Sequence, residues 1–548
     1  MEENRKRHCW ECLRRRLVCD STRPACKRCL TAGTVCSGYS GVKPARLKWL
    51  APGRVTSRSR KSKKGSTPTA ESESTHVFKL KKTVIDHPQY DNPFKVVATT
   101  KSDTTVDITV DTMTESLSFV TLPHFGTTPG IHVLIQASEY YNTCIYQDLQ
   151  PINELGPNPY IYLLSPAHVQ IGLSVPDHLR LGMVCMTLSH RINRTRDNDP
   201  LRNVLTQNFY RYRGIVIRSL NEDINVEHKR TSNLVIAGVI TLLLADVQQG
   251  ASPNWRFHLE GVQKLIALRG GLRTLAASKE SETLLLTFYF LAALGSTTSP
   301  ASDLLMTASH LAELDFMLDR FGNDISRSRL CPPAMFAEIV KINHLRMRAA
   351  TATKVQQQQQ QPTLDPDLDE SNDHLSQEAY AILIRIHAFS PAQWAASKPS
   401  ANHDWALIGK IYQAALVLYC ISSLQSLAVL PPLDRLLLDR RRANARLLRT
   451  RLAEALASPR IKRFVLWPLV VLGVEAVDGD EGMRGFVEEQ LGELSRHIGT
   501  YVPLMGKAVL KSFWAADGGD KTWDVCFDRP YAFSTQLAVE MSGILPVS

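Results

Sequence analysis

The sequence contains no apolar run long enough to cross a membrane. Its longest apolar runs, such as Phe464 to Val474, fall well short of the roughly 18 residues that a membrane span needs. The first residues, Met1 to His8, are polar or charged and lack the apolar segment of a secretory signal. We therefore expect a protein of a reducing intracellular compartment, without a membrane partner.

Motifs that indicate enzyme chemistry are also missing. The chain has no Gly-x-Ser-x-Gly nucleophile elbow, no His-Glu-x-x-His motif, no glycine-rich phosphate loop and no paired carboxylates with identifiable catalytic partners. His258 is the tempting acid-base residue, but it shares an amphipathic helical pattern with Trp255 and Leu259, which favours a hydrogen-bonded packing role. We predict that the protein is not an enzyme.

Acidic residues are scarce near the N-terminus, so the net charge of +11 is unevenly placed. Residues 1–64 contain 18 Lys and Arg but only 4 Asp and Glu, a balance of +14, and the remaining residues sum to −3. A cationic segment of this density favours a polyanionic partner, because each Lys or Arg that meets a phosphate releases condensed counterions. At 548 residues, 44% of them hydrophobic, the chain is long enough for several domains.

Cysteine is sparse along most of the chain but concentrated at its beginning. Six of the eleven cysteines form the series Cys9-x2-Cys12-x6-Cys19-x6-Cys26-x2-Cys29-x6-Cys36. The second half of this series repeats the first after 17 positions. Two tetrahedral zinc ions need eight bonds, and six thiolates supply eight if two of them bridge both metals. The repeat nominates Cys9 and Cys26, the first cysteine of each half, as the bridges.

A disulfide framework is the competing interpretation. It needs an oxidising compartment and is typical of short secreted chains. Neither condition fits this sequence, so we predict a cluster of two zinc ions. The other five cysteines stand singly, mostly in apolar surroundings where buried thiols are expected, and we assign them no chemistry. Cys331, which precedes two prolines, is the candidate for greater exposure.

The stretch between Cys12 and Cys19 contains three consecutive arginines, Arg14, Arg15 and Arg16. They span roughly 200° of a helix, so at least one must point away from the metals. An arginine fork can read guanine in the major groove, whereas the same side chain on a phosphate gives affinity without sequence information. For a single arginine, the phosphate role is the more frequent one.

Residues 9–36 resemble the DNA-binding module of the fungal zinc binuclear cluster transcription factors, whose cysteine spacing they match. The resemblance implies a two-zinc module whose first helix enters the major groove over a CGG-type triplet, with Arg15 and Arg16 near the bases. Asp20 and Pro24 match the acidic residue and the proline of the family pattern. We expect double-stranded DNA as the partner and the nucleus as the location.

Two departures from the family pattern leave the exact DNA preference open. The family usually has basic residues where this chain has Leu13 and Val18. The residues expected to face DNA are Arg14, Arg15, Arg16, Lys27 and Arg28.

Residues 41–128 have the composition of a basic, Ser/Thr-rich and disordered linker. A basic run within it is a candidate nuclear import signal, with a solvated linker as the plainer alternative. Its members are Arg58, Arg60, Lys61, Lys63 and Lys64. The family often places a dimerising coiled coil here, but residues 41–125 show no sustained heptad pattern. A homodimer and a monomer therefore both stay open.

From about residue 129 the apolar residues recur at helical spacing. Helices are predicted at 131–148, 178–193, 205–220, 232–247, 255–266, 282–294, 302–320, 334–350, 376–388, 404–426, 433–457, 463–476 and 482–497. The expected fold is mainly α. It comprises a small two-zinc cluster module (1–40), the linker, and a large all-α regulatory domain in two parts, 129–350 and 376–548.

This helical body resembles, more loosely, the regulatory domain found C-terminal to many such clusters. The likeness covers most of 130–520 and is strongest at Asn254 to Gly261 and Leu466 to Leu469. The resemblance implies a regulatory, sometimes inducer-responsive element without a catalytic site. Transcription machinery or co-regulators are the expected protein partners, and a small-molecule inducer is a further candidate.

Residues 351–375 contain six consecutive glutamines and an acidic stretch, which predict a disordered surface insertion. The acids around Leu364 and Leu368 resemble an activation patch, as does the tail around Trp523, Asp524 and Phe527. A solvated loop and packed aromatic side chains are the plainer alternatives.

An arginine-rich stretch runs from Arg440 to Arg451 and has Leu447, Leu448 and Leu452 at helical spacing. We interpret it as one solvated helix face rather than a second DNA site.

These patterns predict a zinc-dependent, sequence-specific DNA-binding transcription regulator of the RNA polymerase II type, controlled by its helical domain. The alternative is a helical protein-interaction or small-molecule sensor protein whose cluster binds DNA only nonspecifically.

Overall fold

The computed structural model describes residues 9, 12, 17–22, 26–32, 36, 130–156, 158, 160–250, 255–305, 308–358, 366–478, 481–516 and 521–535. They belong to two compact units, one within residues 1–108 and the other within 109–548. The described residues contain many helices and no strand, which confirms the mainly α fold class. The predicted linker and import run lie outside the described residues, as do Arg14, Arg15 and Arg16.

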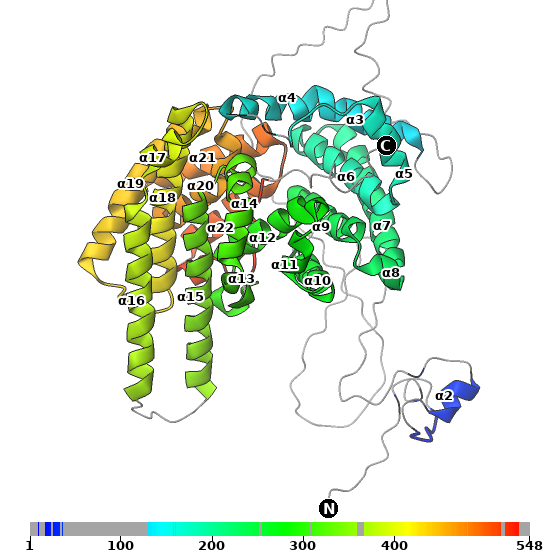
Figure 1. The fold of residues 1–548 in the computed structure, drawn as a ribbon, viewed down its shortest axis with the longest axis horizontal. Helices are drawn as coiled ribbons and strands as arrows, with labels where there is room; N and C mark the ends of the chain where they lie inside the picture. Colours follow the sequence, from blue (N-terminus) through cyan, green and yellow to red (C-terminus); the bar gives the residue numbers. More distant parts are fainter. Residues whose placement is uncertain are drawn as a thin grey trace, which may run out of the picture. The chain divides into compact units, whose positions relative to one another are not determined.

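The first unit contributes one described helix, α2 (Lys27–Thr31). The longer helices of the second unit are α3 (Ile131–Tyr140), α5 (Pro166–Ser174), α6 (Asp177–Arg194), α7 (Pro200–Asn225), α9 (Asn233–Gln249), α10 (Trp255–Leu268), α12 (Glu282–Thr297), α14 (Leu314–Arg329), α15 (Pro333–Gln358), α16 (Pro366–Ala388), α18 (Asn402–Gln425), α19 (Arg435–Ala457), α20 (Leu466–Glu475), α21 (Glu481–Ile498) and α22 (Val502–Ala515). Short helices join them (Figure 1): α4 (Tyr146–Leu149), α8 (Glu227–Arg230), α11 (Leu272–Ala276), α13 (Ala308–Ala312), α17 (Pro391–Ala396) and α23 (Trp523–Cys526).

One apolar core extends through the second unit, from Val133 on α3 to Phe533 in the C-terminal segment. Helix α15 packs against α12, α16 and α18, so it joins the two parts expected on either side of residues 351–375. Helices α15 and α16 also extend into both ends of that range, which was predicted as a disordered insertion. Residues 359–365 lie outside the described part.

The central helices are buried on nearly all sides. Every residue of α12 from Leu284 to Thr297 is buried. Contrary to the expectation that no segment is long and apolar enough to cross a membrane, helix α18 is so by length and composition, yet 89% of its apolar window is buried inside the unit. Its hydropathy is therefore that of a core helix surrounded by other helices. Cys331, for which greater exposure was expected, is fully buried as well, so that expectation was wrong.

The helix predicted at 302–320 is interrupted. The structure has a 3-10 turn at Ala301–Asp303, then α13 and α14. The Arg256 guanidinium donates to the backbone carbonyls of Asp303 and Leu304, which therefore accept from a side chain rather than from a following helical turn. Helices α5 and α17 were not predicted, although each starts with the sequence Ser-Pro, a pairing that favours a helix N-terminus.

The C-terminal segment 521–535 passes through the core of the helical unit. Trp523 and Phe527 are buried, and the Trp523 Nε1 donates to the Thr297 carbonyl at 2.8 Å. The tail aromatics therefore pack, as in the plainer of the two interpretations of this segment.

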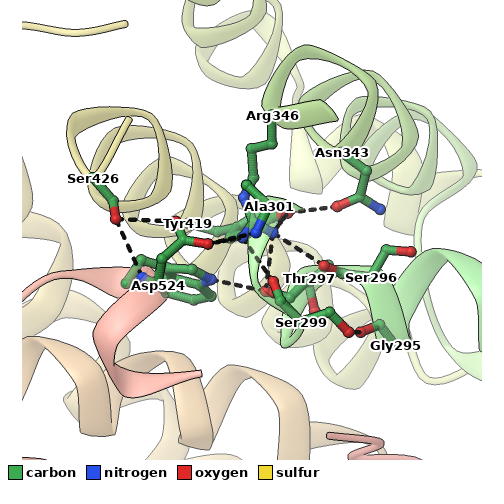
Figure 2. A network of polar contacts seen from close by, with 11 residues as sticks. Gly295, Ser296, Thr297, Ser299, Ala301, Asn343, Arg346, Tyr419, Ser426 and Asp524 are labelled. Carbon is green, nitrogen blue, oxygen red and sulfur yellow. Dashed lines mark hydrogen bonds and ion pairs between the residues drawn. The ribbon is translucent and has the colours of Figure 1, made fainter. Parts of the chain in front are cut away.

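A polar network fixes the segment in place (Figure 2). Arg346 on α15 is fully buried and donates to the carbonyls of Ser296 at 3.0 Å and Ser299 at 2.8 Å. It also donates to the Tyr419 hydroxyl on α18 at 3.1 Å and pairs with Asp524 on α23. Four separate stretches of the chain thus meet at one guanidinium.

Candidate zinc cluster and DNA-binding module

The six N-terminal cysteines converge in the first unit. Cys36 is half-buried and the others are buried. Their sulfur atoms form two groups, in each of which all Sγ atoms lie within 4.8 Å of one another. One group is Cys9, Cys12, Cys19 and Cys26, and the other is Cys9, Cys26, Cys29 and Cys36. Cys9 and Cys26 thus belong to both groups.

The sulfur spacing fits zinc. With a Zn–S bond of about 2.3 Å, two ligands of one tetrahedral zinc lie about 3.8 Å apart. The Sγ of Cys9 lies 3.6 Å from that of Cys26 and 3.7 Å from that of Cys29, and the Sγ atoms of Cys12 and Cys26 are 3.6 Å apart. When bound, two zinc ions would hold these sulfurs as thiolates and tie the two halves of the module together.

The repeat of 17 positions is visible in the backbone as well as in the sequence. The amide of Cys12 donates to the Sγ of Cys9 at 3.3 Å, and the amide of Cys29 donates to the Sγ of Cys26 at 3.3 Å. In the same way, the amide of Cys9 donates to Cys19, and that of Cys26 donates to Cys36. These equivalent N–H···S bonds stabilise negative charge on the sulfurs.

Burial alone would keep these sulfurs protonated. It raises the pKa of Cys9, Cys12 and Cys26 above the ordinary value for a thiol. A cation is therefore needed to hold these three sulfurs as thiolates, and the convergence of six cysteine sulfurs fits a metal centre.

Asp20 organises the link between the two halves. Its Oδ1 accepts from the amides of Thr22 at 2.9 Å and Lys27 at 3.2 Å, and its Oδ2 accepts from the amide of Arg28 at 3.0 Å. Hydrogen bonds from the Thr22 hydroxyl and amide hold the pKa of the Asp20 carboxyl well below its usual range. The carboxylate therefore caps the N-terminus of α2, where negative charge is favoured.

The structure describes two of the five residues predicted to face DNA. Lys27 is exposed on the first turn of α2. Arg28 is also exposed, but its Nη1 donates to the Val18 carbonyl at 2.8 Å, which connects α2 to the chain just before Cys19. Val18 itself is 72% exposed, and it stands where the family pattern has a basic residue.

The sequence pattern does not indicate that Asp20 caps α2 or that Arg28 bonds to the Val18 carbonyl. Asp20 was matched to a family position without a physical role, because its helix begins seven residues later. Only the loop geometry brings the Asp20 carboxylate to the amides of Lys27 and Arg28.

Among the described residues, the two cysteine groups are the only sets of three or more His, Cys, Asp or Glu placed to hold a metal. His258, the candidate acid-base residue of α10, is partly exposed and lies 3.7 Å from Asp246. The Asp246 carboxylate is already bound by the Arg213 fork, at 2.5 Å and 2.7 Å. His258 therefore belongs to a structural polar cluster between helices, beside the buried Trp255 and Leu259.

Comparison with known proteins agrees with this geometry. A family model described as the fungal Zn(2)-Cys(6) binuclear cluster domain matches residues 7–46. A second, described as the fungal specific transcription factor domain, matches residues 137–533. The chain is 42% identical over 546 residues to the phomenoic acid biosynthesis cluster-specific transcriptional regulator of Leptosphaeria maculans, an alignment that covers 99% of this chain and 92% of that protein. No solved structure matches the chain.

Proposed function

We propose that this chain, which belongs to the fungal Zn(2)-Cys(6) transcription factors, reads CGG-like DNA triplets in the nucleus and controls transcription by RNA polymerase II. The family makes the chain a transcription regulator with a two-zinc cluster, and this is not an enzyme class. The proposal adds the sequence that is read, the residues that read it and the role of the helical unit.

The convergence of the six cysteines is the observation that supports DNA recognition by this module. We assign Cys9 and Cys26 as bridging ligands, because both belong to the two sulfur groups. The terminal ligands are then Cys12 and Cys19 on one metal and Cys29 and Cys36 on the other. Metal binding of this kind stabilises a short chain segment that has too few apolar residues for a core of its own.

Recognition is assigned to the basic residues beside the cysteines. Arg15 and Arg16 are proposed to reach base edges in the major groove, with Arg14 and Lys27 on phosphates. Arg28 contributes positive charge near the backbone while its Nη1 braces the module through Val18. The basic run from Arg58 to Lys64 is proposed to serve nuclear import.

The helical unit is proposed to control this activity through co-regulators or a small-molecule inducer. The relative from Leptosphaeria maculans is named as the regulator of a biosynthesis cluster. By analogy we propose that this chain acts on the genes of a biosynthetic cluster.

Selection of bound sequences from a random DNA pool tests the proposal. The zinc-loaded full chain is compared with an Arg15→Ala, Arg16→Ala double variant and with Lys27→Ala as a control for a phosphate contact. We expect enrichment of CGG-like triplets that disappears in the double variant, whereas Lys27→Ala weakens all sequences equally. The spacing of the enriched triplets also reports whether one or two copies bind.

Two outcomes would contradict the proposal. Zinc-loaded protein that enriches no sequence would support the alternative, a helical interaction or sensor protein whose cluster binds DNA only nonspecifically. Equal losses on specific and random DNA for Arg16→Ala would make Arg16 a phosphate contact.

A further inference from the structure

Helix α19 lies on the outside of the helical unit (Figure 1) and concentrates positive charge. It contains seven arginines against Asp439 and Glu454, a balance of +5, whereas the other residues from 65 onward sum to −8. Its inner side packs against α18 and α20, where Leu448 and Leu452 are fully buried. The helix is anchored by these leucines, and much of its charge lies toward solvent.

The outer side of α19 combines arginines with leucines. Arg435, Arg442 and Arg446 are exposed, at spacings of seven and four residues that place them on one face. On the same side Leu436 is 62% exposed and Leu447 is 43% exposed. The solvated face predicted from the sequence is therefore present, but apolar side chains interrupt it.

A third leucine extends the apolar part beyond the helix. Leu433, two residues before α19 begins, is 85% exposed. Asp434 caps the helix, because its Oδ1 accepts from the amides of Leu436 at 2.7 Å and Leu437 at 3.4 Å. The cap fixes the backbone at this end, so Leu433 and Leu436 are presented by an ordered helix start.

Most of the outer arginines are not neutralised by the residues that the structure describes. Arg435 and Arg446 form no ion pair with any residue that the structure describes. Arg442 lies 3.6 Å from Asp439, an exposed pair that contributes little. Arg441 differs, because Glu475 holds its guanidinium at 3.0 Å on the inner side.

Charge decides which partners this surface can accept. The chain's own N-terminal 64 residues carry +14 and are repelled by it. A second copy that placed its own α19 against this one would bring two helices of +5 together. The surface therefore favours an acidic partner.

The exposed leucines favour an acidic protein over nucleic acid as the partner. Nucleic acid would neutralise the arginines but would leave Leu433, Leu436 and Leu447 without apolar contacts. An acidic peptide with apolar residues along one side satisfies both, since arginine rims around apolar centres are typical of protein interfaces.

We propose that the α19 surface, defined as Leu433, Arg435, Leu436, Arg442, Arg446 and Leu447, docks an acidic amphipathic segment of a co-regulator protein. The inference deepens the proposed function, because such a partner would be the means by which the helical unit controls transcription. Docking itself uses only the helical unit and does not depend on the zinc cluster.

Binding of a synthetic peptide tests the proposal. The probe is a fluorescent peptide of about 20 residues with leucines on one helical face and Asp or Glu elsewhere. Its anisotropy is measured against the zinc-loaded full chain. We expect binding that weakens between about 50 and about 200 mM salt.

Two double variants separate charge from apolar contact. Arg442→Glu with Arg446→Glu removes the cationic part, and Leu436→Ser with Leu447→Ser removes the apolar part. Each is expected to weaken binding by about tenfold or more. The matched control is Arg211→Glu with Arg218→Glu, an equal change in net charge at exposed arginines of α7, which is expected to change binding less than about twofold.

Circular dichroism of each variant verifies that the helices are intact, which is expected because all the substituted side chains are exposed. Three results would overturn the proposal: no peptide binding, equal loss in the α7 control, or loss of random duplex DNA binding in the arginine variant without any peptide effect. Zinc chelation distinguishes this proposal from the proposed function, because it should abolish DNA selection and leave peptide binding unchanged.

Discussion

The carboxylate of Asp524 lies 3.1 Å from the Nη2 of Arg346, a guanidinium that is completely buried in the helical unit (Figure 2). The two residues are 178 positions apart in the chain. The same carboxylate accepts from the amide of Ala301 at 2.6 Å and from the hydroxyl of Ser426 at 3.0 Å. The C-terminal segment is therefore part of the core and holds distant helices together.

Removing the charge of Asp524 should destabilise the helical unit. Asp524→Asn leaves the buried Arg346 without its anion, and we expect a loss of about 2–4 kcal/mol in the free energy of unfolding. Urea unfolding followed by circular dichroism at the helical band measures it. Asp528→Asn is the control in the same segment, because Asp528 is exposed and accepts only from the Tyr531 hydroxyl.

A double-mutant cycle separates the energy of the Arg346–Asp524 interaction from the loss of each side chain alone. If Arg346 and Asp524 act together, the double variant Arg346→Met, Asp524→Asn should lose less than the sum of the single variants. Additive losses would show that each residue contributes through its other hydrogen bonds.

Zinc removal should unfold the cysteine module and leave the helical unit folded. Among the described residues of the first unit, the buried cluster consists of the cysteines alone. Structural zinc sites contribute on the order of 10 kcal/mol to folding, so a strong chelator should release two zinc ions per chain and abolish DNA binding. Metal analysis and DNA-binding assays follow the module, and circular dichroism follows the helices.

The second unit, with helices from Ile131 to Cys526, should keep its helical signal during chelation. A DNA-competent protein after complete metal removal would contradict the assignment of the cluster as a structural centre.

Asp20 should control how firmly the module retains its metal. Asp20→Ala removes the acceptor for the amides of Lys27 and Arg28, so the first turn of α2 keeps only the Cys26 Sγ as a side-chain acceptor in the structure described. We expect faster transfer of zinc to a colorimetric chelator, with Asp20→Asn intermediate. Thr31→Ala serves as the control, because that hydroxyl only donates to the Lys27 carbonyl within α2. Equal rates for Asp20→Ala and the control would contradict the capping role.

The stabilisation of the module by the Asp20 carboxylate depends on pH. Hydrogen bonds lower the pKa in the folded module relative to the unfolded value of about 3.9. The stabilisation is therefore fully present above about pH 4 and is lost as the pH falls through the lower folded pKa. Above about pH 5, the difference between the wild type and Asp20→Ala should not depend on Asp20 ionisation.

Acid should destabilise the helical unit through His310. His310 lies close to the rings of Phe288 and Tyr289, and burial lowers its pKa from the ordinary 6.5 to about 4. Because the unfolded chain binds a proton at higher pH than the folded one, stability falls as the pH drops from about 6.5 to about 4, by on the order of 3 kcal/mol from this residue.

Urea unfolding across this pH range tests the contribution of His310. His310→Gln removes this proton site and should reduce the pH dependence, whereas His178 and His190, whose pKa values are also lowered by burial, keep their contributions. His403→Gln is the matched control at an exposed histidine and should leave the profile unchanged. The same slope in His310→Gln and the wild type would assign the acid sensitivity to other groups.

The sequence alone determined the class of this protein. Six cysteines at fixed spacing define the zinc module, because metal ligation depends on local spacing and needs no distant partner. Helical periodicity predicted most of the second unit, since an amphipathic helix repeats its apolar face every three or four residues.

Only the tertiary structure decided where single polar and apolar side chains lie. Asp20 caps α2 across a loop, and Arg346 on α15 contacts Asp524 on α23, 178 positions later in the chain. Adjacent leucines on α19 separate, with Leu448 buried and Leu447 exposed. These outcomes depend on contacts between segments far apart in the chain, and periodicity along one helix contains no information about which neighbour will cover which face.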